Sequence, residues 1–141
     1  MAQDENTTVL IVDDEPANVV LLDAILSPLY NILAATNGEE ALELASDPTS
    51  PCLILLDIMM PKMDGFEVIR QLKKNPQTRD IPTIFVTAKA FDKDEELGFS
   101  LGAVDFIIKP FNINTVISKV AIHVEYYQQR QYMKSLVKKG S

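Results

Sequence analysis

The stretch LILLDIMMPKMDG, residues 53–65, carries the pattern that decides the fold of this chain. Its first four residues form an apolar run typical of a buried strand, and Asp57 closes that run. Asp64 and Gly65 then precede a segment whose apolar residues recur at helical spacing. The stretch therefore predicts a strand that ends in a carboxylate, followed by a loop and a helix.

Short apolar runs that end in polar side chains occur at three other places in the sequence. The polar residues are Asp13 and Asp14, Thr87, and Lys109. In an open parallel sheet, the carboxyl ends of the strands line the crevice where ligands bind. We therefore expect these four side chains to lie with Asp57 in a single crevice.

The order of the elements predicts an α/β fold, because short apolar strands alternate with longer amphipathic segments. Strands are expected near residues 8–12, 30–35, 53–57, 83–87 and 105–108. Helices are expected near residues 16–26, from 37 onward, from 65 to about 75, at 93–101 and from 114 onward. The predicted architecture is a doubly wound, five-stranded parallel sheet flanked by five helices, of which the last is extended.

Length and composition fit one compact domain with a hydrophobic core, since 47% of the 141 residues are hydrophobic. The formal net charge of −7 argues against direct binding of nucleic acid, which depends on Lys and Arg side chains that neutralise phosphates. A single cysteine, Cys52, excludes an internal disulfide and a cysteine-based metal site. It precedes a predicted strand, so we interpret it as a small core residue.

No segment of the sequence has the features of a targeting signal or a membrane span. The first six residues are polar and acidic, without the basic and apolar regions of a signal peptide. No apolar run approaches the ~20 residues that a membrane-spanning helix needs. We therefore expect a cytoplasmic protein that makes no contact with a membrane.

Three carboxylates that converge in one crevice would repel one another strongly unless a cation neutralised them. A hard divalent cation with oxygen ligands, above all Mg²⁺, fits such a site. Asp57 would then be a nucleophile toward a phosphoryl group, with Lys109 and Thr87 compensating the charge on the phosphoryl oxygens. Taken one at a time, these residues also have structural explanations, such as helix capping by Asp13 and Asp14. Their joint arrangement is what favours phosphoryl chemistry.

The motifs around these residues are similar to those of the response-regulator receiver domains of bacterial two-component signalling. The matching segments are Val12-Asp13-Asp14-Glu15, residues 56–65, Val86-Thr87-Ala88 and Lys109-Pro110-Phe111. The resemblance covers about residues 7–124 and implies a flavodoxin-like fold of the chemotaxis-regulator kind. We therefore assign residues 1–124 to a receiver domain.

The resemblance implies a specific chemistry for the crevice. A histidine kinase or a histidine phosphotransfer protein would phosphorylate Asp57, and the Lys109–Pro110 peptide would be cis. Mg²⁺ would be held by Asp13 or Asp14, by Asp57 and by the backbone carbonyl of Met59.

The resemblance also implies a conformational switch. Thr87 would move toward the phosphoryl group and Phe106 would turn inward; the alternative for Phe106 is a plain core aromatic. The surface that changes would combine the helix at 93–101 with the last strand and the last helix. The few apolar residues of 93–101 agree with this interpretation, since mobile elements tend to be weakly packed.

Met59 and Lys89 occupy the two positions that tune the lifetime of the aspartyl phosphate in this family. Neither side chain is a carboxylate or an amide that could position an attacking water molecule. We therefore expect a phosphoryl lifetime longer than that of fast-cycling chemotaxis regulators.

The segment 125–141 continues the apolar pattern of the last helix beyond what a five-stranded domain needs. Three pairs of residues are seven apart, which hints at a heptad repeat over two repeats: Tyr127 and Lys134, Tyr126 and Met133, and Gln129 and Leu136. The segment is either a solvent-exposed helical end, or a signalling helix that pairs with a second copy or leads into an output domain. A homodimer could also form through the surface of the fourth helix, fifth strand and fifth helix.

The sequence favours a phosphorylation-controlled switch that binds partners and is not a turnover enzyme. A Mg²⁺-dependent phosphohydrolase would need a second carboxylate two residues after the nucleophile, where Met59 stands. A scaffold without phosphorylation would not need the complete set of five polar residues. His123, the only histidine, lies within a helix and away from the strand ends, so we expect a surface or interface role and exclude a histidine-based triad.

Overall fold

Five parallel strands form one sheet in the computed structural model, which describes residues 7–47, 51–88 and 92–140. The strands are β1 (Thr8–Val12), β2 (Asn31–Ala35), β3 (Leu53–Asp57), β4 (Thr83–Thr87) and β5 (Asp105–Ile108). They lie in the order β2-β1-β3-β4-β5, so the winding reverses between β1 and β3. The predicted doubly wound parallel sheet is confirmed, with each strand within one residue of its expected position.

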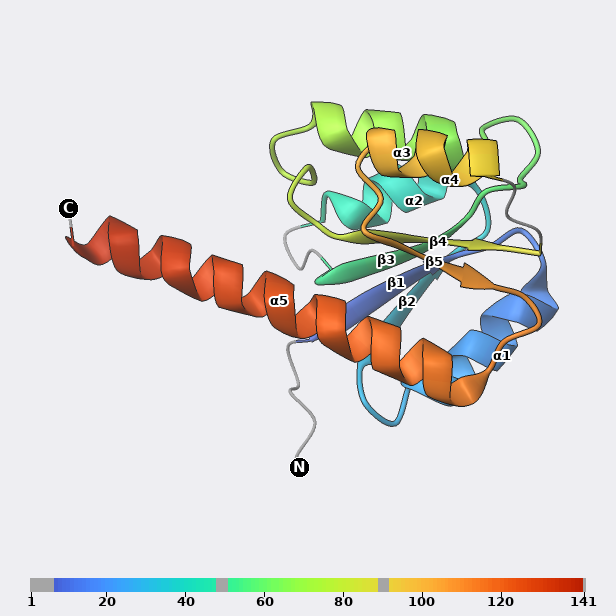
Figure 1. Cartoon of the computed structure of the whole chain (residues 1–141), viewed down its shortest axis with the longest axis horizontal. Coiled ribbons are helices and arrows are strands. Elements are labelled where there is room, and N and C mark those ends of the chain that lie inside the picture. The colour runs from blue at the N-terminus through green and yellow to red at the C-terminus, as the bar shows by residue number, and fades with distance from the viewer. Residues whose placement is uncertain (1–6, 48–50, 89–91, 141) are drawn as a thin grey trace.

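Helices cover both faces of this sheet, as Figure 1 shows. They are α1 (Pro16–Leu26), α2 (Gly38–Ala45), α3 (Gly65–Lys74), α4 (Asp92–Ser100) and α5 (Ile113–Gly140). The helices α2, α3 and α4 lie on one face, and α1 and α5 lie on the other. The sheet has a core on each face, because successive strand residues point to opposite faces. The first core lies under α2 and α3 and includes Leu10 and Val12, and the second core lies under α1 and α5 and includes Val9 and Ile11. Cys52 is partly buried against the second core, in line with a small core residue.

Local sequence signals explain where three of the helices begin. Pro16 occupies the first turn of α1, where its missing N–H would have no partner within the helix. The side chain of Asn37 accepts a hydrogen bond from the backbone N–H of Glu40 at 2.9 Å and caps α2. Asp64 caps α3 in the same way through the backbone N–H of Glu67, also at 2.9 Å.

Gly65 allows the start of α3 to pack directly on the end of β3. A Cβ atom at this position would lie 2.5 Å from the carbonyl oxygen of Asp57 and 2.8 Å from the Cα atom of Ile58. Both of these neighbours are backbone atoms that cannot move aside as a flexible side chain can. The glycine therefore sets how closely the helix approaches the strand that carries Asp57.

The helix α4 contributes little to the core. Leu97 is 37% exposed and Phe99 is 50% exposed. Among residues 93–100, for which burial is described, only Gly98 is buried. Gly98 lies against the rings of Phe85 and Phe106. The expectation that this helix is thinly packed is therefore confirmed.

The helix α5 continues well past the body of the domain, and Figure 1 shows its C-terminal half projecting away from the sheet. Its first half packs on the second core through Val116, Val120 and Val124. Beyond Val124 the helix is tied to the body by a hydrogen bond from Gln128 to Thr7 and an ion pair of Lys134 with Asp80. Within the described ranges, neither α5 nor any other helix is long and apolar enough to cross a membrane.

Candidate functional site

Three carboxylates meet at the carboxyl end of the central strands. Asp13 and Asp14 follow β1, and Asp57 ends β3, the neighbouring strand in the sheet. One oxygen from each lies within 4.8 Å of those of the other two. Asp13 is 1% exposed and Asp57 is 4% exposed, so water does little to screen their repulsion. The sheet therefore brings together the three carboxylates that the sequence singles out.

Lys109 supplies the positive charge in this crevice. Its ammonium nitrogen lies 3.2 Å from Oδ2 of Asp13 and 3.5 Å from Oδ2 of Asp57. The backbone N–H of Lys109 donates to the carbonyl oxygen of Thr87 at 2.8 Å, which joins the ends of β5 and β4. The peptide between Lys109 and Pro110 is cis, as expected. In the described part of the chain, Lys109 is the one cation in contact with these carboxylates.

The environment of Asp57 raises the pKa of its carboxyl group from 3.8 to about 6. Burial is the largest cause, and the charge of Asp13 adds to it, followed at smaller size by that of Asp14. Lys109 and the backbone N–H of Met59 act in the opposite direction and lower the pKa. Burial and the charge of Asp13 therefore raise the pKa of Asp57 by more than Lys109 and the N–H of Met59 lower it.

The oxygen atoms of the crevice fit a hard divalent cation. Asp13 accepts the backbone N–H of Glu15 at 2.9 Å, and Asp57 accepts that of Met59 at 3.2 Å. Asp14 is half-buried and accepts no hydrogen bond from any residue that the structure describes. Three oxygen donors with surplus negative charge are the ligands that Mg²⁺ prefers.

Helix capping does not account for the acidic run before α1. The residue in the N-cap position is Glu15, and its side chain makes no capping hydrogen bond. Asp13 accepts the N–H of Glu15 itself, and its other oxygen contacts Lys109 across the crevice. The geometry therefore favours a role in the crevice over a role at the helix terminus.

The remaining residues singled out in the sequence have different positions. Thr87 ends β4 and is buried, and Asp57 pairs in register with Val86, one residue before it. Met59 follows the crevice with a side chain that is 74% exposed. Lys89 lies outside the described residues. The roles assigned to Thr87, Met59 and Lys89 stay predictions.

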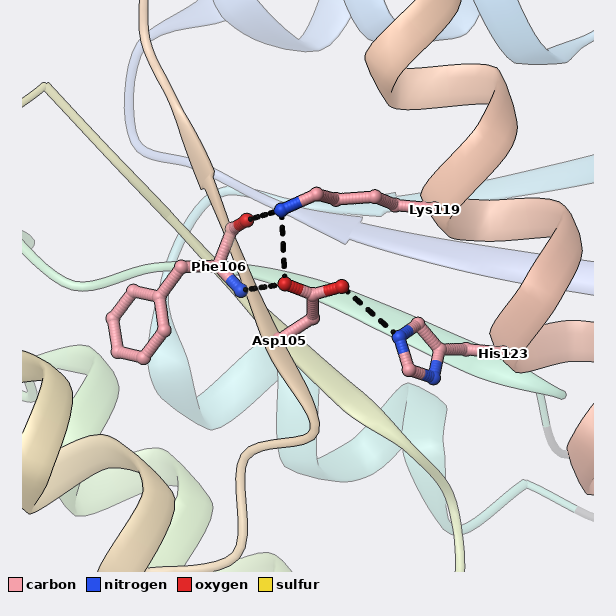
Figure 2. A network of polar contacts seen from close by, with 4 residues as sticks. All are labelled: Asp105, Phe106, Lys119 and His123. Atoms are coloured by element: carbon pink, nitrogen blue, oxygen red, sulfur yellow. Dashed lines mark hydrogen bonds and ion pairs between the residues drawn. The ribbon is translucent and has the colours of Figure 1, made fainter.

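Phe106 lies inside the first core in this structure. Its ring centroid is 5.6 Å from that of Phe85 and 5.2 Å from that of Phe99 on α4. Figure 2 shows the ring on one side of β5, while Asp105 points toward α5 on the other. The inward position is compatible with both interpretations of Phe106, as a switch residue and as a core aromatic.

A polar network between β5 and α5 is absent from the sequence predictions (Figure 2). Asp105 contacts Lys119 at 2.9 Å and Nε2 of His123 at 3.1 Å, and Lys119 also donates to the carbonyl oxygen of Phe106 at 2.7 Å. Burial raises the pKa of Asp105, but the hydrogen bonds from Lys119, the N–H of Phe106 and His123 outweigh it and hold the pKa below its usual value. The four-residue spacing of Lys119 and His123 on one helix face was the signal available in the sequence.

Comparisons with known proteins agree on one family. The sequence model of the family described as response regulator receiver domain matches residues 9–121. A Vibrio cholerae protein named "Probable cyclic di-GMP phosphodiesterase" is 50% identical over 119 residues, which are 84% of this chain and 26% of that protein. The Bacillus subtilis alkaline phosphatase synthesis transcriptional regulatory protein PhoP is 42% identical over 116 residues, 82% of this chain and 47% of PhoP. The chain therefore spans between about a quarter and about half of these two relatives.

Solved structures give the same result for the fold. The chemotaxis protein CheY4 of Vibrio cholerae superposes with a TM-score of 0.77 at 27% identity, covering 85% of this chain and 98% of that one. A CheY-like receiver domain protein from Methanospirillum hungatei superposes with a TM-score of 0.80 at 26% identity, covering 88% of this chain and 98% of that one.

Proposed function

Because the chain belongs to the response regulator receiver domain family, we propose that it is a phosphorylation-controlled switch in which Asp57 accepts a phosphoryl group. The observation that carries this proposal is the burial of Asp57 beside Asp13, with the ammonium group of Lys109 in contact with both carboxylates. A surface turn would explain none of these three features. The proposed donor is a phosphohistidine on a histidine kinase or on a histidine phosphotransfer protein.

The transfer exchanges one bond to phosphorus for another. A carboxylate oxygen of Asp57 attacks the phosphorus atom, a P–O bond forms, and the P–N bond to the donor imidazole breaks. The electron pair of that bond stays with the imidazole, which takes up a proton. With a pKa of about 6, Asp57 is mostly ionised and nucleophilic at neutral pH. Lys109 balances a phosphoryl oxygen, and the hydroxyl group of Thr87 donates a hydrogen bond to another.

We propose that Asp13, Asp14, Asp57 and the backbone carbonyl of Met59 hold Mg²⁺ during the transfer. When bound, the cation orients the phosphoryl group and offsets its negative charge. The fit rests on the three converging carboxylates and on the carboxylate oxygens of Asp14, which accept no hydrogen bond from the described residues and are available to coordinate a cation. Removing Mg²⁺ with a chelator should therefore stop adduct formation.

The proposed switch links the crevice to the surface of α4, β5 and α5. Thr87 ends β4, and its carbonyl oxygen accepts the N–H of Lys109 at the end of β5. Phe106 on β5 contacts Phe99 on the thinly packed α4. A movement of Thr87 toward a phosphoryl group would thus reach an element that costs little free energy to shift.

We propose that the module does not turn over substrate and loses its phosphoryl group slowly. Met59 offers no carboxylate or amide to position water, and its exposed side chain places an apolar group beside the crevice. Lys89 is the second lifetime position by resemblance. A lifetime of seconds for the isolated phosphorylated chain would contradict this proposal.

We further propose that the segment 125–141 transmits the signal as a helix. Ile122, Tyr126, Met133 and Leu136 are all exposed, and together with Gln129 they follow the alternating four- and three-residue spacing of a coiled-coil seam. A second copy of the chain is the proposed partner for this seam, and the surface of α4, β5 and α5 is the alternative dimer contact. In a longer protein the same helix would lead into an output domain.

The proposed output is a partner or a following domain, and not this domain itself. One relative is named for cyclic di-GMP phosphodiesterase and another for transcriptional regulation, so different outputs accompany similar domains. The net charge of −7 supports the proposal that this domain does not contact nucleic acid directly. A cytoplasmic location goes with the proposed kinase partner.

The intact mass of the protein after incubation with Mg²⁺ and a small acyl phosphate tests the proposal. We expect a single phosphoryl adduct, which is absent without Mg²⁺ and in the Asp57→Asn variant. Steady release of phosphate without an adduct would indicate a Mg²⁺-dependent phosphohydrolase instead. No adduct from the acyl phosphate or from a phosphorylated histidine donor would indicate a scaffold.

A further inference from the structure

A cavity of about 170 Å³ lies at the end of the sheet opposite the crevice. Its wall includes Pro82 and Val104, which precede β4 and β5, whereas the crevice lies beyond the last residues of those strands. Tyr126 and Tyr127 form another part of the wall. They belong to the part of α5 beyond Val124, which we call the α5 extension. The cavity is therefore bounded by both the domain body and the projecting helix.

Basic side chains predominate in this cavity although the chain as a whole is acidic. Lys73 from α3, Arg79 from the loop before β4 and Arg130 from the α5 extension all line it. Asp80 is the acidic residue among the lining residues, in a protein of net charge −7. The excess of positive charge is thus local, and it runs against the average of the molecule.

The one carboxylate of the cavity is already occupied. Asp80 accepts a hydrogen bond from Lys134 at 2.8 Å. That hydrogen bond lowers the pKa of Asp80 against a smaller opposing effect of burial, and the charges of Lys134, Arg79 and Arg130 lower it further. A single carboxylate therefore serves four cations: Lys73, Arg79, Arg130 and Lys134. Lys134 makes the close contact with it.

Two guanidinium groups remain without an acidic partner in the described part of the chain. Arg79 makes no ion pair, and Arg130 makes only a cation–π contact, with its guanidinium carbon 5.9 Å from the ring centroid of Tyr126. His123 also lines the cavity, but its Nε2 is engaged by Asp105, as Figure 2 shows. Lys73 differs from the arginines because its ammonium group donates to the carbonyl oxygens of Arg79 and Ile81.

We propose that this cavity binds a small phosphate monoester through Arg79 and Arg130. Guanidinium groups bind phosphate oxygens in pairs and with defined geometry. Drug-sized ligands occupy pockets of roughly 300–1,000 Å³, so a cavity of about 170 Å³ takes the phosphate end of a ligand and leaves a larger body outside.

Binding at this place would join the α5 extension to the domain body. Arg130 belongs to the extension and Arg79 to the loop before β4, so one anion that contacts both bridges the two parts. The Lys134–Asp80 pair already makes one such bridge. The ligand would therefore favour the docked position of the extension, independently of phosphorylation at Asp57.

Backbone amide NMR during titration with inorganic phosphate or glycerol 3-phosphate tests the proposal. The titration is done on the whole chain without Mg²⁺ and at constant ionic strength kept with chloride. We expect saturable shifts of the amides of Gly102, Val104 and Arg130, with the amides around Asp57 unchanged. Shifts that grow linearly with phosphate and never saturate would overturn the proposal, because they indicate only general screening of surface charge.

Paired variants separate a site from a charged surface. Arg79→Gln with Arg130→Gln should weaken binding by roughly tenfold or more, because both charge-assisted contacts are lost. Arg79→Lys with Arg130→Lys should retain weaker saturable binding, and Arg70→Gln on the outer face of α3 should bind as the native chain does. Equal binding by the glutamine pair and the native chain would overturn the proposal. Binding to vesicles that contain phosphatidic acid, without binding of either soluble phosphate, would overturn it as well.

Discussion

The two ends of the sheet carry opposite excesses of charge, and they differ in how firmly those charges are held. At the carboxyl end, three carboxylates converge, and two of them, Asp13 and Asp57, are almost fully buried and contact the ammonium group of Lys109. At the amino end, Arg79 and Arg130 are exposed to solvent, and Asp80 pairs with Lys134 at the surface. Water screens the repulsion between the exposed cations at the amino end, but it does little to screen the repulsion between the buried carboxylates at the carboxyl end. The crevice therefore requires a counterion, whereas the cavity can exist with or without a ligand.

The largest expected difference comes from removing one lysine at each end. We expect Lys109→Met to reduce the free energy of unfolding by about 3 kcal/mol at pH 7 without Mg²⁺, because Asp13 and Asp57 lose their cation while buried. We expect Lys134→Met to change it by at most about 0.5 kcal/mol, because that ion pair is exposed. Urea denaturation of both variants measures the two values. Equal losses would remove the distinction between the two ends.

A second difference should appear in the dependence of stability on pH. The pKa of Asp57 is raised to about 6, so the folded chain binds more protons than the unfolded chain between about pH 4 and 6. Stability then falls as the pH rises through that window, and we expect Asp57→Asn to abolish about 2 kcal/mol of this fall in Mg²⁺-free buffer. Urea denaturation at several pH values measures it.

Asp105, at the amino end, should show the opposite dependence. Its pKa is lowered, so its contribution to stability is present above its ordinary pKa and is lost as the pH falls through the lower, folded-state value. Asp105→Asn should therefore reduce the acid sensitivity and leave the window from pH 4 to 6 unchanged. A fall across that window that persists in Asp57→Asn would show that another group is responsible.

Gly65→Ala tests whether the backbone itself holds the crevice in shape. The added Cβ would meet the backbone of Asp57 and Ile58 at 2.5 and 2.8 Å, so α3 must move away from β3. We expect a loss of about 1.5 kcal/mol in the free energy of unfolding, together with weaker stabilisation of the protein by Mg²⁺ in thermal denaturation. Gln71→Ala, on the exposed face of the same helix, is the control. Unchanged Mg²⁺ stabilisation in Gly65→Ala would mean that the side chains adjust without the backbone.

The smallest change in stability should come from the projecting half of α5. Met133 and Leu136 are exposed and contribute nothing to either core. We expect Met133→Glu with Leu136→Glu to change the free energy of unfolding by less than about 0.5 kcal/mol, while abolishing any dimer seen by sedimentation. A dimer that survives this double change would direct attention to the surface of α4, β5 and α5.

The sequence predicts the carboxyl end of the sheet far better than the amino end. An apolar run predicts each strand there, and the parallel register then places Asp13, Asp57 and Lys109 at the same edge of the sheet. At the amino end, Lys134 meets Asp80 across 54 residues of sequence, with no periodic pattern to indicate the contact. Exposed charges of this kind have many alternative partners, so only the three-dimensional arrangement identifies the cationic cavity.

The length of α5 gives the molecule a mechanical advantage. The helix is 28 residues long and continuous from Ile113 to Gly140. At 1.5 Å per residue, the part beyond Val124 extends about 24 Å, so a tilt of about 10° at its base displaces the tip by about 4 Å. In the proposed switch, the helix would act as a lever arm that converts a change in side-chain packing beside β5 into a displacement as large as an atom's diameter or more. Within the proposed function, the stiffness of the helix would decide how much of that displacement reaches a partner or an output domain.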